Sequence, residues 1–574
     1  MKRGVKAAVQ PSDENVQATG ASDAPISPDE LNLPPTTQPV IPASKIQDPK
    51  PKTQNRLALN TLIVGGAFVL SRVLGLVREA VLAGQFGTGD QYDAYVAAFR
   101  VPDTLFLLII GGAVGSAFIP VFTAHLRKGD DESAWNLAST LINASMLILG
   151  LGGLLMALLA PQLVATLIAP AMSPPQQALV VDLTRVLLLS PIFMGLGGWA
   201  MGILNARQSF TLPALAPVAY NLAIIAGALF LAPVFGIYGL AWGVVVGALL
   251  HFGVQVPGLR RAAMRYSLRL NFQDSGVGEV SKLILPRILG QAAFQFNIIA
   301  MTNIGSFLAT GRISALNYAY LLMMLPHGVF ALSLATVTFP TMSAQYAEGD
   351  FDGLRATLAR AVKVLLFLTL PSAVGLLLLR SEVVAALFQF GAFNRDSTGL
   401  VASALGFFAL GLVAYAVVEV LTRAFYALHD TATPVAVSLA TVLLNLGLSY
   451  TLVRVLGWDH TGLALSLALT TTVEMVLMWV LLGRKMPGWQ LSNSSLAASI
   501  AKSALAALVM GLFLSFFLPA LYGLIPDPGG KLESILILLV GIGAGTGIFI
   551  LAARLLRSSE LNEALSLLMR RLRK

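Results

Sequence analysis

Long runs of apolar residues, separated by short polar stretches, fill the chain from about residue 57 onward. A run of about twenty apolar residues matches the hydrocarbon thickness of a bilayer when it forms a helix that rises about 1.5 Å per residue. The apolar residues do not alternate with polar ones at every second position, as the strands of a membrane barrel would require. The pattern therefore predicts an all-α polytopic membrane protein, and we count fourteen transmembrane helices.

The two ends of the chain have a different pattern from its middle. Residues 1–55 are rich in Pro, Ser and Asp and lack apolar periodicity, which predicts a disordered cytoplasmic tail. No apolar segment follows the early basic residues, so we do not expect a signal peptide. In 557–574, leucines recur on one helical face and the end is basic, which indicates an interfacial amphipathic segment or a topological anchor alone.

The apolar pattern repeats within the chain. The stretch "AFIPVFTAHLRKGDDESAWNLAST" aligns with "VTFPTMSAQYAEGDFDGLRATLAR", pairing Pro120 with Pro340, and Gly239 pairs with Gly462 further on. One shift of roughly 220 residues covers six spans, so the halves share one orientation and predict two parallel six-helix repeats around a central cavity. Such a plan is typical of a two-lobed transporter, although a duplication could also serve stability alone. The predicted parts are an N-lobe at 56–260, a C-lobe at 261–485 and two C-terminal helices at 486–556.

Composition and charge agree with this class. The chain has 574 residues, of which 56% are hydrophobic and 12% charged, with a mean hydropathy of +0.76. The net charge of +9 comes from basic residues in alternate short loops, which favours membrane topology over a nucleic-acid partner and predicts that both termini are cytoplasmic. There is no cysteine, which excludes disulfides and thiolate metal sites. The histidines have no metal-ligand spacing and no catalytic constellation stands out, so we expect a transporter and not an enzyme.

Charged residues inside the first span, 57–84, gather on one face of the helix. Ser71, Arg72, Gly75, Arg78 and Glu79 fall within an arc of roughly 120° at about 100° per residue. A charge at the bilayer centre costs about 2.5–3.5 kcal/mol on insertion scales, and a wet cavity lined by protein lowers that cost. We therefore expect this face to line a central cavity.

The second and seventh spans add charges to the same predicted cavity. Asp93 and Arg100 are seven residues apart in 91–125, and Arg287 and Gln291 lie on one stripe of 279–309. Guanidinium groups bind phosphate oxygens bidentately, so the arginines predict an anionic, lipid-linked substrate. The alternative is that Arg72–Glu79 and Arg100–Asp93 are internal ion pairs that pin helices. The predicted substrate-binding residues are Arg72, Arg78, Asp93, Arg100 and Arg287, with Ser71, Gly75, Glu79 and Gln291 as further cavity or structural residues.

Candidates for ion coupling lie in the second half. Glu474 stands near Thr470 in one span, and Asn445 lies in the span before it. These residues point to proton or sodium coupling, but a single carboxylate among hydroxyls and an amide leaves the choice open. The membrane potential alone could also supply the energy for transport, because moving one charge across 100 mV is worth about 2.3 kcal/mol. We expect no cofactor and no resident metal.

Several motifs together resemble the MurJ/MviN lipid II flippases of the MOP transporter superfamily, over roughly 57–556. They are "SRVLGLVRE" from Ser71, "DAYVAAFRVP" from Asp93, "SAFIP" ending at Pro120, "LFQFGAF" from Leu387 and "FYALHDTATP" from Phe425. The resemblance implies two six-helix lobes enclosing a cationic cavity, with the last two spans forming a groove for the lipid tail. It also implies transfer of the undecaprenyl-pyrophosphate-linked peptidoglycan precursor to the outer leaflet, with Arg72, Arg78 and Asp93 at cavity positions of the family.

This chain departs from the family pattern at two places. Where the family carries charged residues in the second span, this chain has Phe106, Leu107 and Gly111, and in the eighth span it has Tyr320, Leu321 and Met324. Arg287 is a candidate for a substitute cation. The sequence thus predicts a lipid II flippase of the bacterial cytoplasmic membrane that works by alternating access.

Other functions stay open at the level of sequence. The nearest is a flippase for another polyprenyl-linked oligosaccharide, and a membrane scaffold for cell-wall synthesis proteins comes from a different class. A multidrug exporter would favour an acidic cavity for its cationic drugs, and a polyprenyl-handling enzyme lacks a catalytic constellation. The expected partners are the lipid-linked anionic substrate, membrane lipids and cell-wall synthesis proteins.

Overall fold

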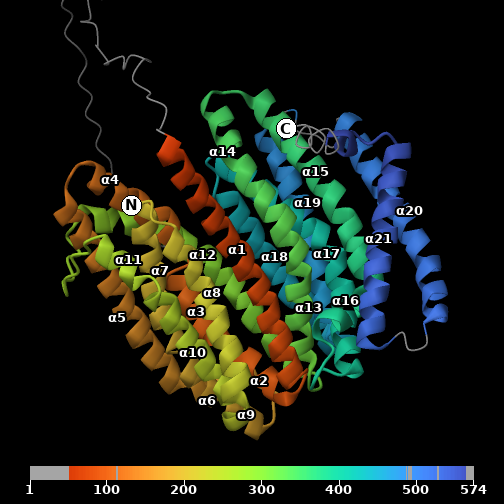
Figure 1. Ribbon diagram of the computed structural model, residues 1–574, viewed down its shortest axis with the longest axis horizontal. Helices are drawn as coiled ribbons and strands as arrows, with labels where there is room; N and C mark the ends of the chain where they lie inside the picture. The colour runs from red at the N-terminus through yellow and green to blue at the C-terminus, as the bar shows by residue number, and fades with distance from the viewer. Residues whose placement is uncertain (1–50, 112–113, 487, 489–493, 526–528, 564–574) are drawn as a thin grey trace, which may run out of the picture. The chain divides into compact units, whose positions relative to one another are not determined.

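The described part of the chain consists of helices joined by short connections (Figure 1). The computed structural model describes residues 51–111, 114–486, 488, 494–525 and 529–563. The first half contains α1 (Pro51–Phe86), α2 (Asp90–Ala98), α3 (Arg100–Ile109), α4 (Ile119–Arg127), α5 (Asp131–Leu163), α6 (Pro174–Leu187), α7 (Ser190–Ala206), α8 (Thr211–Ala226), α9 (Ala232–Phe235), α10 (Ile237–Gly253) and α11 (Val256–Arg261).

The second half has fewer and longer helices. These are α12 (Ser275–Gly305), α13 (Arg312–Pro326), α14 (Ser333–Ala347), α15 (Phe351–Leu378), α16 (Arg380–Phe388), α17 (Arg395–Ala427), α18 (Ala432–Tyr450), α19 (Thr461–Lys485), α20 (Ser494–Leu524) and α21 (Lys531–Leu555). Short π-helical turns interrupt or extend several helices, namely η3 (Val114–Phe118), η4 (Val164–Ile168), η5 (Gly227–Leu231), η6 (His327–Leu332) and η7 (Thr451–Val455). The predicted tail up to residue 50 and the end of the basic C-terminal segment, 564–574, lie outside the described residues.

Eleven helical segments among the described residues are long and apolar enough to cross a membrane. Three predicted spans, 57–84, 91–125 and 279–309, are not among the eleven. The second of these is divided into α2, α3, η3 and α4, whereas α1 and α12 are continuous helices. The protein is an all-helical polytopic membrane protein.

Two helix starts have the same local structure in the two halves. Gly129 and Gly349 have φ of +74° and +72°, a left-handed conformation that glycine adopts without strain. The following aspartates cap the next helices, because Asp130 accepts from the Ser133 amide at 3.0 Å and Asp350 accepts from the Gly353 amide at 2.8 Å. The aligned "GD" pairs of the sequence thus perform the same task at the starts of α5 and α15.

Close helix packing relies on small residues, as is usual where lipid gives no hydrophobic drive between helices. A methyl group on Gly227 would lie 2.6 Å from the Cα atom of Gly243, so these two glycines let α10 approach η5. The largest buried cluster joins residues of α2, α6, α10, α13 and α17. Figure 1 shows α20 and α21 next to α15 and α16, with which they form direct contacts. The described residues from 60 onward form a single compact unit.

Candidate functional site

The charged face of α1 is held in place by an amide on α8. Arg78 donates through Nε to Glu79 Oε1 and through Nη1 to Asn221 Oδ1, both at 3.1 Å. The Asn221 amide also donates to the carbonyl of Ser71 at 3.3 Å, and a methyl group on Gly75 would lie 4.0 Å from the Asn221 nitrogen. Asn221 therefore fixes both the guanidinium and the backbone of α1 on the face that the sequence singled out.

Arg78 and Glu79 line a cavity of about 210 Å³ between α1, α2, α3, α8 and α13. Its polar lining includes Arg100 and Asp103 from α3 and Asn317 from α13. The two arginines and two carboxylates balance one another, so this described lining is polar without being cationic. The lining of this cavity would carry a net positive charge only with arginines in addition to Arg78 and Arg100.

Arg100 connects this cavity with a second one. The chain breaks helix at Phe99, so Arg100 opens α3 and its Nε donates to Thr302 Oγ1 of α12 at 2.9 Å. Arg100 and Asn317 line both cavities, and the second has a volume of about 230 Å³. The lining of the second is largely apolar and aromatic, and Tyr320 belongs to it. An arginine therefore stands where a polar chamber meets an apolar one.

Asp93 does not pair with Arg100 but fastens α2 to α13. Its carboxylate accepts from the amide of Gly311 at 2.6 Å, from the amide of Ser314 at 2.7 Å and from the Ser314 hydroxyl. The side chain is buried, with 3% exposed. Asp93 thus closes one end of the space between the two halves, and the predicted helix-pinning pair Arg100–Asp93 does not form among the described ion pairs.

Close backbone contacts reinforce the same closed end. The amide of Ala392 donates to the Gly84 carbonyl at 2.8 Å, and a methyl group on Gly391 would lie 2.2 Å from that carbonyl oxygen. Thr88 and Ser397 share a hydrogen bond of 2.7 Å between their hydroxyls. These contacts place the "LFQFGAF" stretch directly against the end of α1. We call this region, with Asp93 and its partners, the seal.

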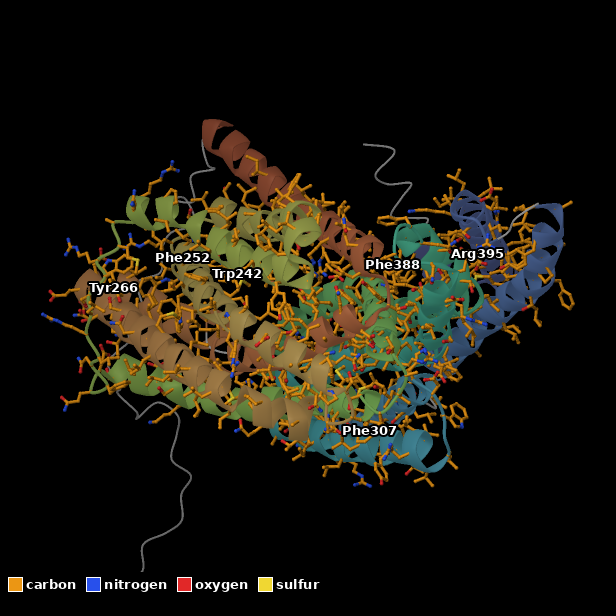
Figure 2. All side chains as sticks on the ribbon, turned by 90° about the horizontal axis from the view of Figure 1, so that it is seen from below. Trp242, Phe252, Tyr266, Phe307, Phe388 and Arg395 are labelled. Carbon is orange, nitrogen blue, oxygen red and sulfur yellow. The ribbon has the colours of Figure 1, made fainter. Side chains whose placement is uncertain are left out.

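Aromatic rings fill the seal from within. Tyr92 stacks on Tyr318 with ring centroids 5.0 Å apart, and Tyr318 contacts Phe388 and Phe393 at 5.2 and 5.7 Å. All four side chains are almost fully buried. Figure 2 shows Phe388 among the packed helices near the end of α1. These rings come from both halves, so their packing joins the halves at the closed end.

The remaining predicted cavity residues lie in varied positions. Arg72 is exposed and points toward η6, since a methyl group on Gly328 would lie 3.8 Å from Arg72 Nη1. Among the described ion pairs, Glu79 pairs with Arg78 and not with Arg72. Gln291 is half-buried on α12 and is not among the residues that line the two cavities. Arg287 belongs to α12, but its side chain lies outside the described residues.

Two of the three ion-coupling candidates, Asn445 and Thr470, belong to one hydrogen-bonded network. Asn445 donates to Thr470 Oγ1 at 3.2 Å, and Ser449 donates to Asn445 Oδ1 at 2.8 Å. Glu474 stands apart from this network and accepts from the Ser438 hydroxyl at 2.5 Å. No group of carboxylates or histidines that could hold a metal occurs among the residues that the structure describes.

Sequence reasoning missed four residues of the site. Tyr220, Asn221, Asn317 and Thr302 line the cavities or hold their arginines. The available signal was the side-chain amide of Asn221 or Asn317 in a largely apolar helix, because polar groups inside membrane spans usually belong to a functional site. Neither amide has a helix-spaced charge beside it, so the pattern of charges alone did not reveal them.

Comparison with known proteins gives consistent results. The family model "Lipid II flippase MurJ" matches residues 82–525. A lipid II flippase MurJ of Burkholderia cenocepacia is 33% identical over 444 residues, covering 75% of this chain and 85% of that protein. A probable lipid II flippase MurJ of Rhizobium tropici is 32% identical over 461 residues, covering 78% of this chain and 85% of that protein.

Solved structures agree at the level of fold. A lipid II flippase MurJ in an inward closed conformation matches with a TM-score of 0.72 and 25% identity, over 86% of this chain and 98% of that chain. An inward-facing multidrug resistance MATE family transporter of the MOP superfamily matches with a TM-score of 0.64 and 16% identity, over 74% of this chain and 96% of that chain. The second match concerns the fold alone. Because the family model covers more than half of the chain and a relative above 30% identity covers three quarters of it, this chain belongs to the lipid II flippase MurJ family.

Proposed function

We propose that this protein moves lipid II, the undecaprenyl-pyrophosphate-linked peptidoglycan precursor, from the inner to the outer leaflet of the bacterial cytoplasmic membrane. Membership of the family supports the substrate. The observation that carries the mechanism is a polar cavity with two arginines, adjacent to a seal that closes one end of the space between the halves. A transporter that is closed at one end is one state of an alternating-access cycle.

The proposed architecture has fourteen spans. Eleven segments meet the apolar criterion, and α1, the broken stretch α2–α4 and α12 supply the other three. Two six-helix repeats enclose the cavity, and α20 and α21 lie outside the repeat. The matching caps at Asp130 and Asp350 support the repeat.

The proposed orientation places the seal on the outer side of the membrane. The connections at the seal, 87–89, 306–311 and 389–394, join spans on the side that is poor in basic residues. The arginine-rich connection after α11 then lies in the cytoplasm, with both termini. In this orientation the structure corresponds to a state closed to the outside, in which lipid II would enter from the cytoplasmic side.

We assign the pyrophosphate of lipid II to Arg78 and Arg100, the arginines that line the two cavities described above. Arg78 and Arg100 are held by Glu79, Asn221 and Thr302, so their guanidinium groups are already oriented when the substrate arrives. Pre-organised guanidinium groups bind phosphate oxygens with less loss of side-chain freedom than mobile lysines would. Because the lining of the first cavity is balanced in charge, Arg72 of α1 and Arg287 of α12 stay our candidates for further cations that bind the pyrophosphate.

Opening of the seal is the step that would release lipid II outward. In our proposal, the halves separate at the outer end as Asp93 loses its bonds to Gly311 and Ser314, while they approach at the cytoplasmic end. The membrane potential favours this direction, because an anion moving to the positive outer face gains about 2.3 kcal/mol per charge per 100 mV. Sodium or proton coupling through Asn445, Thr470 or Glu474 remains a separate hypothesis.

A second candidate is a flippase for another polyprenyl-linked oligosaccharide. Tyr320 stands on α13 where the family carries a charged residue, and it lines the apolar chamber. A less polar chamber favours a head group with fewer charges than the peptide-bearing sugar of lipid II. The same superfamily fold would serve both substrates.

Complementation tests the proposed function. A bacterium depleted of its own lipid II flippase would receive the intact chain or the double variant Arg78→Ala with Arg100→Ala, with membrane levels measured for each. We expect growth with the intact chain and none with the double variant. The matched control is Arg185→Ala, because Arg185 is a half-exposed arginine on α6 that pairs with Asp182 at 3.7 Å, outside the cavities. No rescue by the intact chain at normal membrane levels would favour the second candidate.

A further inference from the structure

The connection between α11 and α12, residues 262–274, runs along α5, and we call it the strap. Residues 264–271 have no regular secondary structure, yet they are fastened at several points. The amide of Asn143 on α5 donates to the carbonyls of Ser267 and Arg269 at 2.8 and 2.9 Å. The Tyr266 hydroxyl donates back to Asn143 Oδ1 at 2.6 Å. One asparagine therefore bonds to three residues of the strap, Tyr266, Ser267 and Arg269.

Two hydroxyls of α5 extend this attachment. The Ser267 amide donates to Ser139 Oγ at 3.2 Å, and the Asn271 amide donates to Thr140 Oγ1 at 3.4 Å. Ser139 and Thr140 are fully buried beneath the strap. The backbone groups that face α5 belong to residues 267, 269 and 271, which is the two-residue spacing of an extended chain.

The side chains of the strap alternate with the same period. The odd positions carry polar side chains, and the even positions carry large apolar ones that are strongly exposed. The exposed fractions are 50% for Tyr266, 88% for Leu268, 48% for Leu270 and 64% for Phe272. A two-residue alternation gives an extended segment one apolar edge and one polar edge. Figure 2 shows Tyr266 at the outer margin of the molecule beside α5.

The position of the strap on α5 relates it to the membrane. The large apolar side chains exposed on this helix and its extension η4 begin at Leu147 and end at Leu167. Twenty residues at about 1.5 Å per residue span about 30 Å, which is the thickness of the hydrocarbon core. Asn143 lies one turn, about 6 Å, before Leu147 on the same face. The strap therefore lies where the hydrocarbon gives way to lipid head groups.

Positive charge surrounds the apolar edge. Arg260 and Arg261 end α11, and Arg265 and Arg269 belong to the strap itself; all four are exposed. Exposed arginines next to exposed aromatic and leucine side chains at the edge of a lipid-facing belt are typical of segments that lie in an anionic membrane surface. The aromatic Tyr266 and Phe272 fit the interfacial zone, where aromatic rings gather.

We propose that the strap is a membrane-surface anchor, whose edge of Tyr266, Leu268, Leu270 and Phe272 inserts into the head-group region of an anionic leaflet. Arg265 and Arg269 contact lipid phosphates in this arrangement. The leaflet is the cytoplasmic one in the orientation given above. The anchor goes beyond lipid II transfer and does not require it, because it concerns bulk anionic phospholipid and a surface far from the cavity arginines. It holds the start of α12, the helix that supplies Thr302 to Arg100.

Site-directed spin labelling tests the anchor, since the chain has no cysteine to remove. Nitroxides would be attached to Leu268→Cys and Phe272→Cys in the full chain, reconstituted in phosphatidylethanolamine vesicles that contain phosphatidylglycerol. The matched controls are Asn271→Cys and Gln273→Cys, which lie on the polar edge of the same strap. Collision rates with oxygen, which concentrates in lipid, and with a water-soluble nickel chelate report the depth of each label.

We expect the oxygen-to-nickel ratio at positions 268 and 272 to exceed that at 271 and 273 by about threefold or more. Replacing phosphatidylglycerol by phosphatidylcholine would reduce this difference, because the arginines would then meet zwitterionic head groups in place of anionic ones. Equal ratios at all four positions would overturn the proposal. Distance measurements between labels would also overturn it if they showed a second copy of the chain covering positions 268 and 272.

Discussion

Removing the Asp93 carboxylate is predicted to open the seal. In the sealed state Asp93 accepts three hydrogen bonds, from the amides of Gly311 and Ser314 and from the Ser314 hydroxyl. Asp93→Ala leaves these donors unpaired in a site with 3% exposure. In an open state the same donors would be hydrated, so the substitution raises the free energy of the sealed state relative to the open one.

The size of the effect follows from the bonds that are lost. Hydrogen bonds to a charged group contribute about 1.5–3 kcal/mol each, but bonds that share one carboxylate do not add fully. We therefore expect the sealed state to lose about 2–4 kcal/mol, which changes the open-to-sealed ratio by about thirtyfold to several hundredfold. Asp93→Asn keeps one acceptor oxygen and should have a smaller effect in the same direction.

Cysteine accessibility measures the ratio. Ser397 contacts Thr88 in the seal and is 5% exposed, so Ser397→Cys in this cysteine-free chain should react slowly with a membrane-impermeant maleimide. Asp93→Ala should raise the labelling rate from the outer side of intact cells. Asp182→Ala is the control, because Asp182 is a half-exposed carboxylate outside the seal. An unchanged labelling rate in Asp93→Ala would refute the view that this carboxylate holds the seal.

Two further predictions concern stability. Gly391→Val should lower the melting temperature of the purified protein, because the added side chain begins 2.2 Å from the Gly84 carbonyl and strains a φ of +59°. The stability of the protein should also depend on pH through Asp430. Burial alone would raise the pKa of this carboxyl, but hydrogen bonds from Lys485 and Thr433 outweigh burial and lower the pKa below its ordinary value. The stabilisation by this pair is present above the unfolded pKa of about 3.9 and is lost as the pH falls through the folded pKa.

Both stability predictions have internal controls. For the glycine, Gly399→Val on α17 is the comparison, because no atom lies within 4 Å of a methyl group at that position. Equal melting temperatures for Gly391→Val and the parent would contradict the close contact. For the carboxylate, Asp430→Asn should melt lower than the parent at pH 7, and the difference should shrink at pH 3.5. A difference that stays constant between those pH values would contradict the lowered pKa.

The fold could be predicted from sequence because membrane helices follow a local rule. Twenty apolar residues can satisfy their backbone in lipid only as a helix, so block length alone identifies most spans. The broken second span was harder to foresee. Residues 91–125 are apolar enough to be counted as one span, but Phe99 and the stretch after Ile109 interrupt the helix. Tertiary contacts of Asp93 and Arg100 accompany the first break.

The site was predictable only where charge marked it. The arc of Arg78 and Glu79 was visible in the helical periodicity, and both residues line the first chamber. The partners of these residues could not be inferred, because a neutral amide such as Asn221 has no spacing rule that links it to a helix far along the chain. Asp93 was singled out as a cavity residue, but its bonds to Gly311 and Ser314 depend on how the two halves meet, which periodicity does not specify.

The central claim is that Arg78 and Arg100 hold the phosphates of lipid II during transfer across the membrane. The most direct measurement is the fraction of lipid II on the outer face of cells that lack their own flippase, read by an externally added enzyme that cleaves lipid II. We predict that the intact chain and Arg185→Ala expose lipid II to cleavage, whereas Arg78→Ala with Arg100→Ala leaves it protected. Cleavage that is equal with the double variant and with the intact chain, at equal membrane levels, would contradict the account.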